Sequence, residues 1–149
     1  MKKLLLTSAL ICFISSASAL EIGINTGYSY AGADRATYGV SVGDKVGAIG
    51  LAATYDRATK TNNDQNRYGV IASYDVAKVA GATVAVKSGV AYLNNQDGTN
   101  GFAGSVGAGV SYPLFKDVAL TADYRYQAGQ KRVESFNGNT LTAGVKFSF

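Results

Sequence analysis

The C-terminal stretch, residues 139–149, constrains the fold of this chain more than any other part of the sequence. In an extended strand, successive side chains point to opposite faces. From residue 141 onward, one face of this stretch would carry only apolar side chains: Leu141, Ala143, Val145, Phe147 and Phe149. The other face would be small or polar, from Thr140 to Ser148. Chain ends of soluble domains tend to fray, so an apolar strand with an aromatic end favours a closed barrel whose apolar face meets lipid.

Residues 1–19 have the pattern of a secretory signal peptide. The segment begins with lysines, continues with a short apolar run, and ends with the small residues Ala17 and Ala19 at a cleavage site. Its apolar run is shorter than the roughly 20 residues that a membrane-spanning helix needs. We therefore expect cleavage after Ala19 and a single domain over residues 20–149.

Composition removes several kinds of site from the mature chain. The only cysteine, Cys12, lies in the signal segment, and the sequence has no histidine. We therefore expect no disulfide, no metal site and no cofactor. The formal net charge of +4 falls to +2 without Lys2 and Lys3, so the basic balance does not indicate a nucleic-acid partner.

Seven further runs of alternating residues precede the closing strand, and no long helical periodicity follows Ala19. The runs cover residues 20–30, 37–43, 48–56, 68–76, 83–92, 102–112 and 118–127. A run of roughly 9–11 residues is long enough to cross a bilayer at a tilt of about 45°. With the closing strand, the sequence predicts eight transmembrane strands.

The links between these runs alternate between short and long. Short links are expected at residues 44–45, 77–81 and 113–117, and longer polar links at residues 31–36, 57–66, 94–100 and 129–138. Short turns at one end and longer loops at the other are typical of outer-membrane barrels. Both chain ends fall on the short-turn side, which predicts that this side faces the periplasm.

Alternation alone does not say which face of the sheet points inward. A soluble lipocalin-like barrel would bury its apolar face and pack its aromatic residues in a core. Here the other face consists mainly of Gly, Ala, Ser and Thr with few charges, which suits the crowded interior of an eight-stranded barrel. All ten tyrosines fall on the apolar face, mostly near strand ends, as in the aromatic girdles of membrane barrels. The sequence therefore favours an apolar exterior.

The predicted interior carries charges of both signs. They are Glu21, Asp75, Lys87, Asp123, Arg125 and Lys146, with Asp56 and Arg67 near the outer rim. Buried charges are tolerated when they are paired, and eight strands leave little room, so a lumen plugged by ion pairs is favoured. The alternative is a narrow porin-like channel lined by Lys87, Asp123 and Arg125. Glu21 and Lys146 lie on the first and last strands, which must be neighbours if the barrel closes.

Catalysis is not indicated by any motif. A histidine-assisted serine, as used by outer-membrane lipid hydrolases and acyltransferases, is excluded because the chain has no histidine. Asp75 and Asp123 come without a supporting motif. The glycine-rich residues 101–109 lack the Lys-Ser/Thr of a phosphate loop and fall on a predicted strand. We therefore predict that the protein is not an enzyme.

The long links carry several cations: Arg57, Lys60, Arg67, Lys131 and Arg132. A basic rim of this kind could contact the phosphates of lipopolysaccharide. Ordinary solvated loops are the simpler interpretation.

Residues 20–149 resemble the small bacterial outer-membrane β-barrel family, which includes the transmembrane domain of outer-membrane protein A and the opacity-type surface antigens. The resemblance rests on the eight runs, on the turn formed by residues 112–117, and on the ending formed by residues 143–149. It implies that Phe147 and Phe149 are an assembly signal for the barrel-assembly machinery. It also implies periplasmic chaperones, outer-membrane lipid and lipopolysaccharide as partners of a monomer. The links are shorter than the loops of adhesins in the family, which argues against host-cell adhesion.

The sequence therefore predicts an all-β protein, an eight-stranded antiparallel up-and-down transmembrane β-barrel of the bacterial outer membrane. The expected role is structural or that of a surface antigen. The alternative role is a narrow porin-like channel for ions or small solutes.

Overall fold

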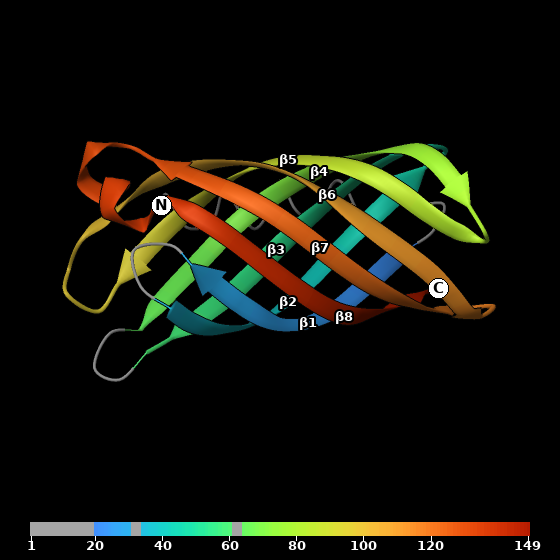
Figure 1. Cartoon of the computed structure of the whole chain (residues 1–149), viewed down its shortest axis with the longest axis horizontal. Helices are drawn as coiled ribbons and strands as arrows, with labels where there is room; N and C mark the ends of the chain where they lie inside the picture. Colours follow the sequence, from blue (N-terminus) through green and yellow to red (C-terminus); the bar gives the residue numbers. More distant parts are fainter. Residues whose placement is uncertain (1–19, 31–33, 61–63) are drawn as a thin grey trace, which may run out of the picture.

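Eight antiparallel strands form one closed barrel in a computed structural model of the chain (Figure 1). The structure describes residues 20–30, 34–60 and 64–149. Each strand pairs with its neighbours in sequence, and β1 pairs with β8 to complete the circle. The predicted fold class is confirmed. The expected signal peptide, with Ala17 and Ala19, lies outside the described residues.

The strands are long relative to the links between them. They are β1 (Leu20–Tyr30), β2 (Asp34–Val46), β3 (Ile49–Thr59), β4 (Gln65–Val79), β5 (Ala82–Asn95), β6 (Asn100–Phe115), β7 (Val118–Gly129) and β8 (Gly138–Ser148). A short 3-10 helix, η1 (Lys131–Phe136), lies between β7 and β8. Among the described residues, no helix is long and apolar enough to cross a membrane.

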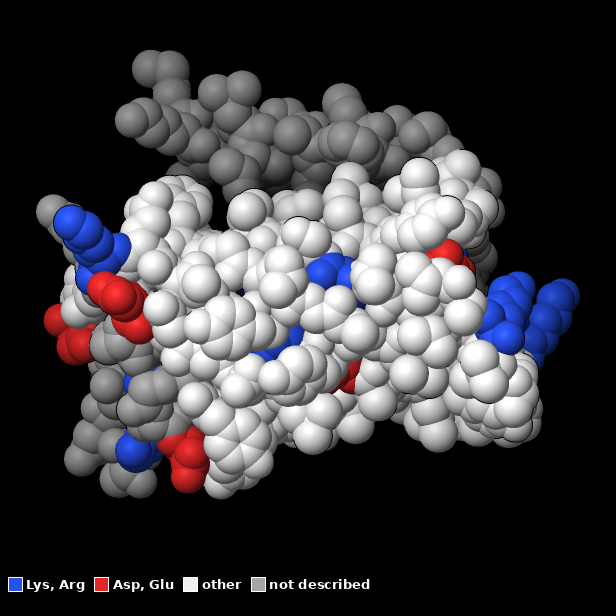
Figure 2. All heavy atoms as spheres, turned by 45° about the horizontal axis from the view of Figure 1, so that its top comes forward, with Lys and Arg blue, Asp and Glu red and all other residues white. Residues whose placement is uncertain are grey.

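The outer face of the barrel is a band of exposed apolar side chains. On β6, the outward side chains from Phe102 to Tyr112 include Val106 and Val110, all of them exposed. Ten residue steps of about 3.3 Å, tilted by about 40°, span about 25 Å, which is the height of the apolar band of membrane barrels. Figure 2 shows charged side chains at the two ends of the barrel and a largely uncharged surface between them.

Tyrosines lie on this outer face, as predicted. Nine of the ten are among the exposed large side chains, and the tenth, Tyr55, packs its ring against Tyr68 with the centroids 5.1 Å apart. Next to them, the rings of Tyr92 and Phe102 are 5.2 Å apart. These rings gather towards the end of the barrel that carries the longer links, which we call the long-loop end.

The predicted short turn at residues 44–45 is wrong. Both residues belong to β2, and the turn follows at Gly47, whose φ of 62° favours glycine. The other short links are also tighter than predicted, because β4 continues to Val79 and β6 to Phe115. Each of these two strands contains a bulge near its end, which interrupts the alternation that the prediction used. These turns define the short-turn end of the barrel.

Candidate functional site

The inward faces of the strands bring together charges that lie far apart in the sequence. One row of paired positions around the barrel carries Lys45, Lys87 and Arg125, with small residues between them. The neighbouring row, two residues away along the strands, carries Asp75 and Asp123. Cations and carboxylates therefore occupy adjacent levels of the interior.

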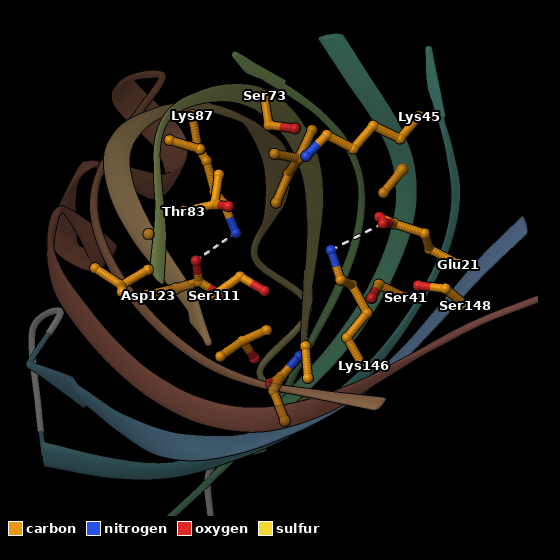
Figure 3. Close-up of a pocket in the computed structure, with 18 of the residues that line it drawn as sticks. Glu21, Ser41, Lys45, Ser73, Thr83, Lys87, Ser111, Asp123, Lys146 and Ser148 are labelled. Carbon is orange, nitrogen blue, oxygen red and sulfur yellow. Dashed lines mark hydrogen bonds and ion pairs between the residues drawn. The ribbon is translucent and has the colours of Figure 1, made fainter. Parts of the chain in front are cut away.

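Lys87 on β5 and Asp123 on β7 form an ion pair that crosses the strand between them (Figure 3). Lys87 Nζ donates its hydrogen bond to Asp123 Oδ1. On the intervening β6, a Cβ atom added at Gly109 would overlap Asp123 Oδ1 and lie 2.8 Å from Lys87 Cε. The missing side chain of Gly109 therefore provides the space that the pair occupies.

Gly109→Ala should separate this ion pair and lower the free energy of unfolding by about 1–3 kcal/mol, the usual cost of overfilling a packed interior. The matched control is Gly104→Ala on the same strand, because a Cβ there meets nothing within 4 Å. Urea unfolding of the two variants, refolded in lipid vesicles, makes the comparison. Equal stabilities would show that the space at Gly109 does not matter.

Lys45 on β2 and Asp75 on β4 form a second pair that crosses a strand. Lys45 Nζ lies 2.5 Å from Asp75 Oδ2, and β3 runs between the two strands. Residues 44–45 were predicted to form a turn, so Lys45 was not among the predicted interior charges and no partner was named for Asp75. The structure corrects this, because β2 continues past residue 45 and its alternation directs Lys45 inward.

Two further pairs join other parts of the wall. Lys146 Nζ lies 2.9 Å from Glu21 Oε1 across the seam where β8 meets β1. Arg125 Nη2 donates to Asp56 Oδ2 at 3.2 Å, which links β7 to β3 through the interior. Asp56 is buried.

These pairs line a chamber of about 320 Å³ in the half of the barrel nearer the short turns (Figure 3). At the short-turn end, the exposed residues Lys116 and Asp117 contribute to its lining. At its inner limit lie Asp56 and Arg125, which also line a second cavity further towards the long-loop end. That second cavity holds only about 20 Å³, which is room for about one water molecule.

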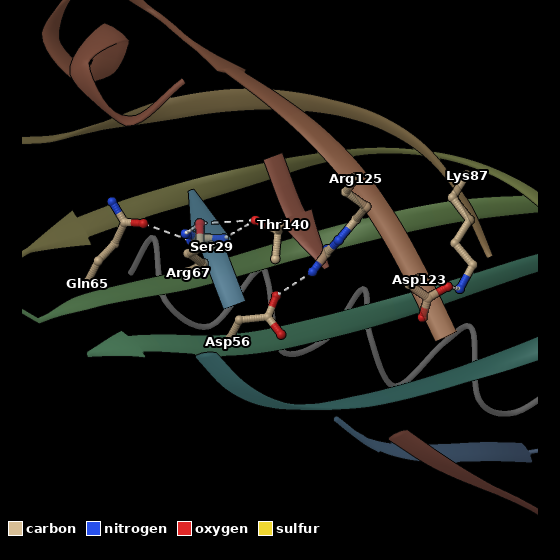
Figure 4. Close-up of polar contacts among 8 residues, drawn as sticks. All are labelled: Ser29, Asp56, Gln65, Arg67, Lys87, Asp123, Arg125 and Thr140. Carbon is tan, nitrogen blue, oxygen red and sulfur yellow. Dashed lines mark hydrogen bonds and ion pairs between the residues drawn. The ribbon is translucent and has the colours of Figure 1, made fainter. Parts of the chain in front are cut away.

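A polar layer centred on Arg67 fills the interior beyond the Arg125–Asp56 pair (Figure 4). Arg67, only 4% exposed, donates from Nε to Gln65 Oε1 at 2.7 Å and from Nη2 to Ser29 Oγ at 3.0 Å. Its Nη1 donates to Thr140 Oγ1 at 3.4 Å. Gln65 in turn donates to Asn95 Oδ1 at 2.7 Å. The guanidinium is thus held by side chains from several strands.

An apolar layer lies at the long-loop end. Val133 of η1 is fully buried and packs with Leu93 of β5 and Ala103 of β6. A Cβ at Gly129 would lie 2.5 Å from Val133 Cγ2, and a Cβ at Gly101 would lie 3.2 Å from the same side chain. The two glycines therefore leave space for Val133 between β6 and β7.

The structure distributes the predicted interior charges over four pairs. Glu21 lies with Lys146, and Lys87 lies with Asp123. Asp75 contacts Lys45, and Arg125 contacts Asp56. Whether these residues plug the lumen or line a path stays a prediction.

Arg67 was predicted both among the interior charges near the outer rim and among the cations of the long links, and its placement in a link is wrong. The prediction began the fourth strand at Tyr68, whereas β4 begins at Gln65 and its alternation turns Gln65 and Arg67 inward. That alternation was visible in the sequence. The insertion of Val133 was harder to find, because a single apolar residue in a polar link has no periodicity to follow.

The predicted assembly signal lies at the edge of the β1–β8 seam. The Phe149 N–H donates to Leu20 O at 2.9 Å, while its side chain is 76% exposed. Phe147, also exposed, lies opposite Ile22. Within the described part of the chain, no three His, Cys, Asp or Glu residues are grouped to hold a metal ion.

Several solved structures share this fold. Neisserial surface protein A is 19% identical with a TM-score of 0.71, covering 88% of this chain and 96% of its own. The N-terminal β-barrel domain of OprF from Pseudomonas aeruginosa is 21% identical with a TM-score of 0.73, covering 89% of this chain and 98% of its own. The outer-membrane enzyme PagL is 11% identical with a TM-score of 0.53, covering 87% and 98%. At these identities the likeness shows the fold alone.

Sequence comparison gives the family. No curated protein matches the chain. The family model described as YfaZ precursor matches residues 1–148, which is nearly the whole sequence. The chain therefore belongs to the YfaZ precursor family.

Proposed function

We propose that this chain is an integral outer-membrane barrel with a structural or surface-antigen role, a closed lumen and no catalytic activity. Support for the location comes from the closed sheet and the apolar outer band, because lipid tolerates no unpaired strand edge. The family description as a precursor fits a signal peptide that is removed after Ala19.

Closure of the lumen is supported above all by the small volume that remains in its outer half. Three successive layers cross the interior there: the Arg125–Asp56 pair, the hydrogen bonds around Arg67, and the apolar contacts of Val133. The cavity between the first two layers holds about 20 Å³. A hydrated ion needs a continuous column of water, and one water site does not supply it.

The fold itself is compatible with catalysis, because the outer-membrane enzyme PagL has a similar barrel, but the side chains of this chain do not support it. The chain has no histidine. Each of the interior carboxylates Glu21, Asp56, Asp75 and Asp123 is bound to a cation. A carboxylate that already contacts a lysine or arginine is not free to contact a substrate, which suits a structural role better than catalysis.

The partners that we propose follow from the two ends of the barrel. At the long-loop end, Lys60 and Lys131 are exposed and could contact the phosphates of lipopolysaccharide. At the other end, Phe147 and Phe149 would be bound by the barrel-assembly machinery, after periplasmic chaperones have delivered the chain. We propose a monomer, surrounded by outer-membrane lipid.

A narrow channel for ions or small solutes is the second candidate. It is favoured by the chamber, whose charged lining reaches from the short-turn end to Arg125. In this alternative, the outer layers would have to open.

Conductance in a planar bilayer separates the two candidates. We expect the refolded wild-type barrel, checked by its gel shift between unboiled and boiled samples, to form no steady channels. The double variant Arg67→Ser with Val133→Ser should conduct, because it removes two of the three layers and leaves only the Arg125–Asp56 pair, a single contact of 3.2 Å, across the lumen. Arg57→Ser with Val106→Ser is the matched control at more exposed positions. Steady wild-type channels that change with Lys87→Glu would overturn the closed lumen in favour of the channel.

A further inference from the structure

We propose that the chamber is a binding site for a small zwitterion, a molecule with one ammonium and one carboxylate group such as a free amino acid. This inference goes beyond the structural role, because it gives the inner half of the lumen an occupant that would enter from the short-turn end.

The size and access of the chamber fit a small molecule. Its volume of about 320 Å³ lies at the lower end of the range of roughly 300–1,000 Å³ found for ligand sites. The Arg125–Asp56 pair and the layers beyond it close the other end. A solute that enters therefore stays in a pocket with one opening and does not pass through.

The lining is balanced in charge. Five cations and five carboxylates contribute to it: Lys45, Lys87, Lys116, Arg125 and Lys146 against Glu21, Asp56, Asp75, Asp117 and Asp123. A ligand with a net charge would leave that charge uncompensated between the walls of the barrel, which is costly. A zwitterion adds no net charge and can bind a cation and a carboxylate at once.

Two ion pairs on facing walls supply the groups that such a ligand needs. Lys87 and Asp123 lie on one side of the chamber, and Lys146 and Glu21 on the other (Figure 3). The four side chains remain 19–25% exposed, so both members of each pair can be reached. The ammonium group of the ligand would bind the carboxylate of one of these pairs, and the carboxylate group of the ligand would bind the lysine of the same pair. One ion pair is then exchanged for two.

Uncharged groups around the same space can complete the contacts. Ser41, Ser73, Thr83 and Ser111 also line the chamber, with Thr83 and Ser111 beside the Lys87–Asp123 pair and Ser41 beside Lys146 (Figure 3). A hydroxyl both donates and accepts a hydrogen bond, so it can serve either end of a zwitterion. By contrast, the Arg125–Asp56 pair is only 16% and 6% exposed and serves as the floor.

The test is an NMR titration of the refolded, isotope-labelled barrel in detergent micelles with glycine as the probe. Methylammonium and acetate, each added alone at matched ionic strength, carry the two charges separately. We expect glycine to cause saturable shifts in the amide signals of residues around the chamber, such as Thr83 and Ser111. Equal shifts with methylammonium or acetate, shifts confined to the long-loop end, or no saturable shift would each overturn the proposal.

A filled chamber provides the matched variant. Ser111→Phe should raise the Kd for glycine at least about tenfold, whereas Ala108→Phe, on the exposed outer face of the same strand, should leave it unchanged. Equal affinities in the two variants would overturn the proposal. If Ser111→Phe does not fold, the position of the wild-type shifts decides. A barrel that is silent in the bilayer and does not bind glycine would overturn this inference and leave the closed lumen intact.

Discussion

Lys87→Glu should lower the free energy of unfolding of the barrel by about 2–3 kcal/mol, somewhat less than the 3–5 kcal/mol lost when a fully buried pair is broken. The smaller value reflects the exposure of the Lys87 and Asp123 side chains, 25% and 19%. The substitution removes the cation that Asp123 contacts and places a second carboxylate beside it. Urea unfolding in lipid vesicles, followed by the gel shift, measures the loss.

The matched control restores the pair in the opposite sense. Lys87→Glu combined with Asp123→Lys places a cation and a carboxylate on the same two strands, and should recover at least half of the lost stability. Wild-type stability in the single variant would contradict the importance of the pair. A double variant as unstable as the single one would show that the position of each charge matters, and not only their pairing.

Phe149→Ala should reduce the amount of folded protein in the outer membrane several-fold while export through the signal peptide continues. The Phe149 side chain is 76% exposed, so its removal costs little packing, and its backbone bond to Leu20 O is kept. A large loss in cells would therefore reflect recognition during assembly. The heat-modifiable fraction in isolated outer membranes gives the measurement.

Phe115→Ala is the control for this experiment. Phe115 lies at the same end of the barrel and is 74% exposed, so its substitution removes an aromatic surface of similar size. We expect it to assemble normally, and we expect both variants to refold alike in lipid vesicles without any assembly machinery. If both variants lost the same amount of folded protein in cells, the loss would reflect reduced hydrophobicity at this end of the barrel and not recognition of Phe149.

The strands and their faces could be predicted from the sequence because lipid imposes a strict alternation. Outward positions such as Val106 and Tyr124 must be apolar, and inward positions such as Gly107 and Asp123 must be small or paired. At the ends of the strands, which lie outside the apolar band, the alternation of apolar and small residues no longer marks where a strand stops. The predicted turn at residues 44–45 was therefore wrong, and the ends of β4 and β6 were placed too early.

The partners of most interior charges could not be predicted. Which side chains meet depends on how far neighbouring strands are offset, and single strands do not reveal that offset. Glu21 and Lys146 were the exception, because closure of the barrel makes β1 and β8 neighbours. The Arg67 layer needs Ser29, Gln65 and Thr140 from three strands, and the apolar layer depends on the fold of η1.

The ion pairs that cross a strand have a consequence for assembly fidelity. A slip of one strand by a single residue exchanges its two faces and is penalised by lipid at once. A slip by two residues keeps every apolar side chain outside, so the outer surface cannot oppose it. Such a slip would move Asp123 away from Lys87, or Asp75 away from Lys45. Charges without an ion-pair partner would then remain inside the barrel. The interior charges thus destabilise barrels in which one strand is shifted by two residues, a misassembly that the lipid does not oppose.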